Sequence, residues 1–173
     1  MKKQVLAAAA CLLFVGAGCT APASPAPEEI PAPAVPGSPS AENGLPTEGW
    51  ELADTGAFTV ALPPGWEFRP MQGIDSLVGE FTGDGAALSF DYGWYSNPLA
   101  GEEDPDHAVT YETIDGRRAK IVVPRVVGRG TTGVYVEGLG TGGMDRLQVS
   151  GENLTAAQQE TVLGIFRTIR FAE

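Results

Sequence analysis

The densest set of side chains that could do chemistry lies in the stretch GEEDPDHA, before a predicted strand that begins near Ala108. Hard cations such as calcium bind several carboxylate oxygens, which a flexible loop can supply, and an imidazole adds a ligand that suits transition metals. The spacing matches neither an EF-hand nor a two-histidine zinc motif. A solvated acidic loop is therefore the alternative interpretation, and a divalent cation is the one cofactor that the sequence suggests. The candidate metal ligands are Glu102, Glu103, Asp104, Asp106 and His107.

A second candidate site is an aromatic cluster formed by Tyr92, Trp94 and Tyr95, with Asn97 after them. Aromatic side chains combine a large contact face with a polar edge, so the cluster could line a groove for an apolar or sugar-like ligand or for a partner protein. Strand alternation from Phe90 places Tyr92 and Trp94 on the side expected to be buried. Tyr95 lies on the opposite side and is expected to be free.

No complete catalytic constellation accompanies these residues. A catalytic triad requires a nucleophile, a base and an orienting acid, but His107 is the only histidine, and no serine lies in a Gly-x-Ser-x-Gly motif. A glycosidase would need two carboxylates at a separation that a sequence does not give. We therefore expect no enzymatic activity, with an envelope hydrolase as the third alternative. The candidate carboxylates for that alternative are Asp75, Glu80, Asp84 and Asp91.

The beginning of the chain, MKKQVLAAAACLLFVGAGC, has the order of an export signal. Two lysines precede an apolar run over residues 5–15, which is too short to span a bilayer as a permanent helix. The segment resembles the lipobox of bacterial lipoproteins, except that Gly16 replaces the usual larger apolar residue. We expect residues 1–18 to be a signal peptide and Cys19 to be lipidated, which anchors the exported protein to a cell-envelope membrane. A secretory peptide cleaved after Cys19 is the alternative.

The segment after Cys19 has the composition of a tether. Residues 19–46 are rich in proline, alanine and serine and show neither strand nor helix periodicity, so they could reach roughly 80 Å when extended. The composition then changes, and residues 47–173 are expected to form a single globular domain. Because Cys11 and Cys19 are the only cysteines, this domain can contain neither a disulfide nor a thiolate site.

The charge of the chain argues against a nucleic-acid partner. Its formal net charge is −11 at pH 7, whereas binding to nucleic acid or anionic lipid headgroups requires a basic patch. The expected partners are a membrane, reached through the N-terminal lipid, and an envelope protein or small ligand.

Most of the globular part is predicted as short strands. Apolar and polar residues alternate over residues 58–62 and 88–92, and paired apolar residues mark further strands at 134–136 and 147–149. Turn signals separate these runs, which favours an antiparallel sheet.

Residues 108–123 are predicted to form a hairpin whose turn decides which face is apolar. A two-residue loop, Asp115-Gly116, would place Glu112 on the buried face, where an unpaired charge is costly. We therefore expect a three-residue loop over residues 114–116, with Glu112 facing Arg118 at the surface.

The C-terminal segment is predicted to form an amphipathic helix. Residues 155–158 have the form of a capping box, and the apolar residues that follow recur at helical spacing and must pack on a sheet face. Residues 169–171 are expected to pass into a short extended segment. The apolar positions are Val162, Ile165, Phe166 and Ile169.

Four stretches of the domain resemble small bacterial lipoproteins of the PsbP-like class: FTVALPPGW, GIDSLVGEF, LSFDYGWYSNPL and NLTAAQQETVLGIFRTIRF. The resemblance implies an antiparallel sheet sandwiched by helices. It also implies a non-catalytic accessory role, which in this class includes stabilising a metal cluster in photosystem II. The segment between Trp66 and Tyr92 contains no long helical pattern, so we expect loops to cover one side of the sheet.

Together these features predict an α+β fold. We expect an antiparallel sheet of about six to seven strands, with the C-terminal amphipathic helix packed on one face in a PsbP-like sandwich. The expected function is that of a lipid-anchored, non-enzymatic binding or accessory module of the cell envelope. A periplasmic module that binds a metal ion or another small ligand is the main alternative.

Overall fold

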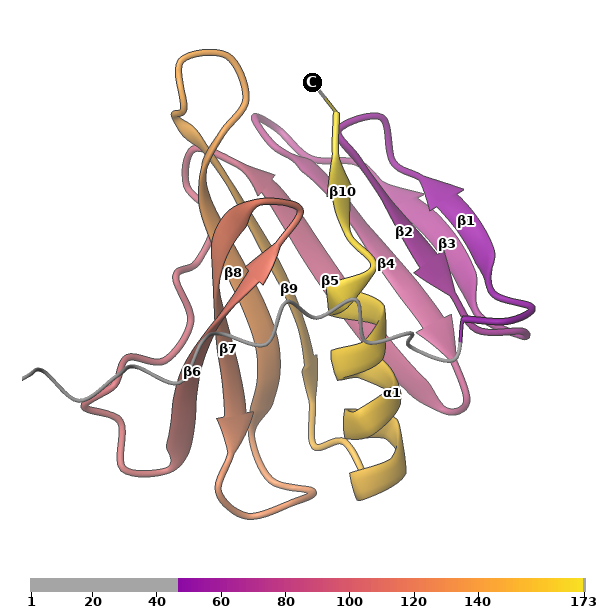
Figure 1. Ribbon diagram of the computed structural model, residues 1–173, viewed down its shortest axis with the longest axis vertical. Helices are drawn as coiled ribbons and strands as arrows, with labels where there is room; N and C mark the ends of the chain where they lie inside the picture. Colours follow the sequence, from indigo (N-terminus) through magenta and orange to yellow (C-terminus); the bar gives the residue numbers. More distant parts are fainter. Residues whose placement is uncertain (1–46, 173) are drawn as a thin grey trace, which may run out of the picture. The chain divides into compact units, whose positions relative to one another are not determined.

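The computed structural model describes residues 47–172, which form two antiparallel sheets and one helix (Figure 1). The predicted signal peptide, Cys19 and the whole of the predicted tether lie outside the described residues. No helix within the described part is long and apolar enough to cross a membrane.

The larger sheet has seven strands, as expected, whereas the separate sheet of three strands was not predicted. In spatial order, the larger sheet contains β3 (Glu67–Met71), β4 (Leu77–Gly83), β5 (Ala86–Gly93), β9 (Asp145–Glu152), β8 (Thr131–Leu139), β7 (Arg117–Pro124) and β6 (His107–Ile114). The smaller sheet contains β1 (Glu51–Asp54), β2 (Phe58–Leu62) and β10 (Arg170–Phe171), and the helix α1 spans Ala156–Arg167.

The predicted strand patterns are confirmed. Residues 58–62 form β2, in which buried and half-buried residues alternate strictly. Residues 88–92 lie within β5, and the apolar pairs at 134–136 and 147–149 lie within β8 and β9. Alternation of this kind follows from the two-residue period of a strand with one covered face.

One face of the larger sheet, here called the inner face, packs against α1 and the smaller sheet (Figure 1). Three phenylalanine rings join the layers: Phe58 lies 5.2 Å from Phe90 in an edge-to-face arrangement, and Phe81 stacks on Phe90 at 5.2 Å. Such aromatic pairs contribute about 0.5–1.5 kcal/mol each beyond their burial. The predicted apolar stripe of α1 lies in the same core, with Phe166 fully buried.

The predicted cap of α1 is confirmed. Thr155 and Gln158 form both hydrogen bonds of a capping box, and the Gln158 side chain also donates to the carbonyl oxygen of Asp84 in the β4–β5 turn. At the other end, the Thr168 hydroxyl accepts a hydrogen bond from the backbone N–H of Ala61 in β2. The chain then enters the predicted extended segment, which is β10.

The predicted three-residue loop between β6 and β7 is wrong. Ile114 pairs with Arg117 and Glu112 with Ala119, so the loop has two residues. Asp115 and Gly116 both have positive φ, at 48° and 73°, as a type I′ turn requires.

A salt bridge from α1 explains why this register is tolerated. Arg167 donates two hydrogen bonds, of 2.9 and 2.7 Å, to the Glu112 carboxylate. Glu112 therefore lies on the inner side of β6 without being an unpaired charge, and it does not face Arg118. The Asp115 carboxylate further accepts a hydrogen bond from the N–H of Phe171, which ties the turn to β10.

The opposite face of the larger sheet, here called the outer face, is covered by a loop, as predicted. Residues 94–106, here called the crossing loop, connect β5 in the middle of the sheet to β6 at its edge (Figure 1). The buried Ser96 hydroxyl lies 2.9 Å from the carbonyl oxygen of Asp91 and holds the start of the loop. Leu99 packs closely over Gly133: a Cβ atom on residue 133 would lie only 2.6 Å from Cδ1 of Leu99.

Breaking the salt bridge should test this interpretation of the hairpin. The hydrogen bonds from Arg167 lower the pKa of the Glu112 carboxyl, so the stabilisation is complete above the unfolded pKa and is lost as pH falls through the folded pKa. In urea denaturation, Glu112→Gln and Arg167→Gln should each lower the free energy of unfolding by about 1 kcal/mol at neutral pH. The double variant should lose less than the sum, and the coupling should vanish in acid. Fully additive losses would contradict the account.

Candidate functional site

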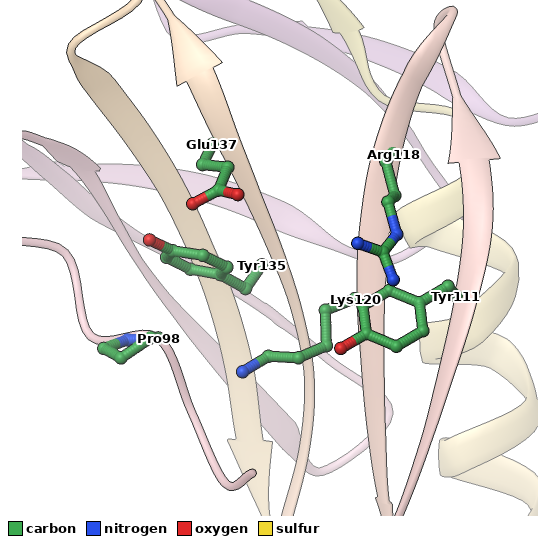
Figure 2. A pocket seen from close by; sticks show the side chains of 6 residues that line it. All are labelled: Pro98, Tyr111, Arg118, Lys120, Tyr135 and Glu137. Atoms are coloured by element: carbon green, nitrogen blue, oxygen red, sulfur yellow. The ribbon is translucent and has the colours of Figure 1, made fainter. Parts of the chain in front are cut away.

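The outer face carries a hollow of about 350 Å³ beside the crossing loop, here called the outer-face hollow (Figure 2). It is open to solvent and is lined by aromatic and charged side chains from three neighbouring strands and by one proline of the crossing loop. The lining residues are Pro98, Tyr111, Arg118, Lys120, Tyr135 and Glu137.

Strand register brings these side chains together. Tyr111 of β6 lies opposite Lys120 of β7, and Lys120 lies opposite Tyr135 of β8. Residues opposite one another in antiparallel strands point to the same face, so the three side chains form one row across the sheet, with Lys120 between the two tyrosines (Figure 2). Arg118, two residues before Lys120, projects from the same face.

Both tyrosine rings in the row contact a cation. The Arg118 guanidinium lies 3.7 Å from the centre of the Tyr111 ring, and the Lys120 ammonium lies 5.4 Å from that of Tyr135. Such contacts are worth about 0.5–1 kcal/mol at exposed sites. Lys120 is the only lysine after Lys3 in a chain whose net charge is −11. The hollow is thus a place where an acidic protein presents positive charge beside aromatic rings.

Both phenols of the hollow are held in their protonated form. The pKa of Tyr111 is raised mainly by a hydrogen bond with the Glu102 carboxylate. The pKa of Tyr135 is raised mainly by burial. At neutral pH the Tyr135 hydroxyl can therefore donate a hydrogen bond to a ligand, whereas the Tyr111 hydroxyl donates to Glu102.

Two of the predicted metal ligands, Asp104 and His107, are engaged in hydrogen bonds within the protein. The Asp104 carboxylate lies 3.2 Å from Nδ1 of His107 and accepts a hydrogen bond from the N–H of Asp106. The backbone N–H of Thr131 can only donate, so Nε2 of His107, 3.3 Å away, accepts and Nδ1 carries the proton. Within the described residues, no three side chains of His, Cys, Asp or Glu are grouped to hold a metal ion.

These contacts lead to an expectation about metal binding. Coordination through His107 would break one of its two hydrogen bonds, so millimolar calcium, manganese or zinc should leave the melting temperature unchanged. A ligand that binds the native state must raise that temperature. A rise of several degrees that disappears in Asp104→Asn would contradict this expectation and support the metal site.

The predicted aromatic groove is divided between two faces. Tyr92 is half-buried on the inner face, where its ring lies 6.4 Å from that of Phe58. Trp94 and Tyr95 stack at 6.3 Å and are 52% and 77% exposed. The predicted burial of Trp94 is wrong because β5 ends at Gly93, where strand alternation stops.

The last member of the predicted groove has a local role. The Asn97 side-chain oxygen accepts a hydrogen bond from the N–H of Leu99, two residues further along the crossing loop. This contact shapes the turn that brings Leu99 over Gly133. Asn97 is therefore engaged within the crossing loop, and Tyr92, on the inner face, does not share a groove with the exposed aromatic pair.

The candidate glycosidase carboxylates are distributed along β4 and β5. Asp75 and Asp84 lie just beyond the two ends of β4, so they cannot form a pair. Glu80 and Asp91 occupy diagonal positions on the outer face, since Glu80 pairs with Ser89. The Asp91 carboxylate lies 3.2 Å from the Ser96 hydroxyl that holds the crossing loop.

The outer-face hollow was not predicted from the sequence. The signal that could have revealed it is the two-residue turn at Asp115-Gly116, because that register alone places Tyr111 beside Lys120. Comparisons of the chain with models of protein families, with curated proteins and with solved structures find no match. The chemistry of the hollow is therefore the basis for a functional proposal.

Proposed function

We propose that this chain is an exported, lipid-anchored binding module of the cell envelope that acts without catalysing a reaction. The signal-like N-terminus, Cys19 and the tether support the anchoring. The observation that carries the binding role is the outer-face hollow, where two tyrosines and two cations lie side by side on a face without a helical cover in the described residues.

The lining favours an anionic saccharide as the ligand. Tyrosine rings pack against the apolar faces of sugar rings, while their hydroxyls bond to the polar edges. Arg118 and Lys120 can donate charge-assisted hydrogen bonds to carboxylate or phosphate groups on the sugar. Glu137 adds an acceptor for sugar hydroxyls.

The fold supports an accessory role in a second way. Its antiparallel sheets and C-terminal helix fit the proposal that the domain is a PsbP-like sandwich, the class that four stretches of the sequence resemble. Members of that class act mainly by binding and stabilising other components. On this proposal the tether positions the module, and the hollow selects what it binds.

A saccharide titration should test the ligand class. We expect purified protein to bind trigalacturonic acid more tightly than maltotriose in calorimetry, since only the former carries carboxylates. Lys120→Met should weaken binding of the acidic sugar about tenfold, the loss of one hydrogen bond to a charged group. Arg129→Met, an exposed cation on the loop between β7 and β8, is the matched control and should change little. Equal effects of the two variants, or no binding of either sugar, would contradict the proposal.

The anchor has its own test. Cys19→Ala should move the protein from the membrane fraction to the soluble fraction, because the lipid is the proposed attachment. The melting temperature of the released protein should equal that of the detergent-solubilised wild type. Continued membrane association of the variant would show that another segment holds the protein there.

A further inference from the structure

The strand β6 is a free edge of the larger sheet. Its eight residues pair with β7 without interruption, from His107 opposite Pro124 to Ile114 opposite Arg117. Among residues 47–172, no other strand pairs with β6. Its second side is therefore available for hydrogen bonding along its length.

The register identifies the backbone groups that point away from the sheet. A two-residue turn is closed by a hydrogen-bonded pair, here Ile114 and Arg117, and such pairs alternate with non-hydrogen-bonded ones along the ladder. Val109, Tyr111 and Thr113 belong to the second kind. Their N–H and C=O groups are directed outward, two residues apart, in the spacing that an added strand needs.

The other long edge is protected, whereas β6 is not. Proteins prevent an exposed edge strand from pairing with another chain by means of proline, lysine, β-bulges or unpaired charges that point inward. At the far side of the sheet, β3 contains Pro70, and in the smaller sheet β1 has only four residues. In contrast, β6 has no proline, lysine or bulge, and its one acidic side chain, Glu112, is neutralised by Arg167.

Charge identifies the kind of strand that would fit. The crossing loop ends where β6 begins, and its exposed carboxylates Glu102 and Glu103 form no salt bridge within the described residues. The Asp104 carboxylate lies 3.2 Å from Nδ1 of His107, the first residue of β6, so this acidic part of the loop adjoins the strand. A second copy of the chain would bring the same carboxylates together at this edge, which is unfavourable. A segment with lysine or arginine would bring opposite charges together instead.

We propose that β6 binds an extended, basic segment of a partner protein as an added strand of the larger sheet. Backbone hydrogen bonds to Val109, Tyr111 and Thr113 would supply affinity, and alternate side chains of the segment would supply specificity. Those on the outer side would lie next to Tyr111, on the face that the crossing loop covers. The added strand would bond to the backbone of the edge, whereas the saccharide interaction uses side chains of the outer-face hollow; Tyr111 borders both sites.

Peptide binding tests the proposal directly. The probes are a peptide as long as β6 in which lysine alternates with valine, and a matched peptide with glutamate in place of lysine. Binding is followed by heteronuclear NMR on the ¹⁵N-labelled protein. We expect the lysine peptide to shift the amide signals of Val109, Tyr111 and Thr113, and the glutamate peptide to leave them unchanged.

Two sets of variants separate edge pairing from general attraction. Thr113→Pro removes an outward N–H group but no hydrogen bond to β7, and proline is tolerated at such a position of an edge strand. This variant should weaken binding of the lysine peptide more than tenfold. The control variant Thr113→Val keeps the N–H group and should bind as the wild type does. The double variant Glu102→Gln with Glu103→Gln alters exposed side chains only. It should weaken binding about fivefold, as expected for two surface ion pairs.

Three results would overturn the proposal. The first is equal binding of the two peptides, and the second is unchanged binding in both Thr113→Pro and the double glutamine variant. The third comes from sedimentation of the purified protein: a dimer that Thr113→Pro dissociates would show that a second copy occupies the edge. A monomer in sedimentation supports the proposed occupant.

Discussion

The structure depends on the packing of α1 and the smaller sheet against one face of the larger sheet. Phe58, Phe90 and Phe166 meet in this core, and their burial removes the apolar side of β2, β5 and α1 from water. The described residues contain one helix, α1, and it packs on the inner face. The outer face is covered only by the crossing loop, so the side chains that line the outer-face hollow stay at least partly exposed.

Local patterns predicted most elements of this fold but not β1, β3 and β4, and a long-range contact decided one register. The alternation in β2 and the capping box of α1 depend on near neighbours, and both are as expected. The loop of the hairpin was predicted wrongly because Glu112 has no partner for its charge on the buried face of the hairpin itself. Its partner, Arg167, lies 55 residues further along the chain, and a pattern within the hairpin does not contain that information.

The candidate sites changed because hydrogen bonds within the fold engage some of the predicted residues. Within residues 102–107, the His107 imidazole is bonded to Asp104 and to the N–H of Thr131. The outer-face hollow arises between strands, from single residues whose proximity follows only from the pairing of β6, β7 and β8. The register of the β6–β7 hairpin thus accounts for three features. These are the type I′ turn, the salt bridge between α1 and β6, and the row of side chains on the outer face.

We propose that the outer-face hollow is open to solvent in the free protein and is covered by its ligand in the envelope. Lys120 provides a direct probe, since it is the only lysine after Lys3. The rate at which an amine-reactive ester acylates Lys120, followed by mass spectrometry, can be compared for purified protein and for protein bound to isolated envelopes. The account predicts ready labelling of the free protein and labelling at least several-fold slower on envelopes. Equal rates in the two states would contradict it.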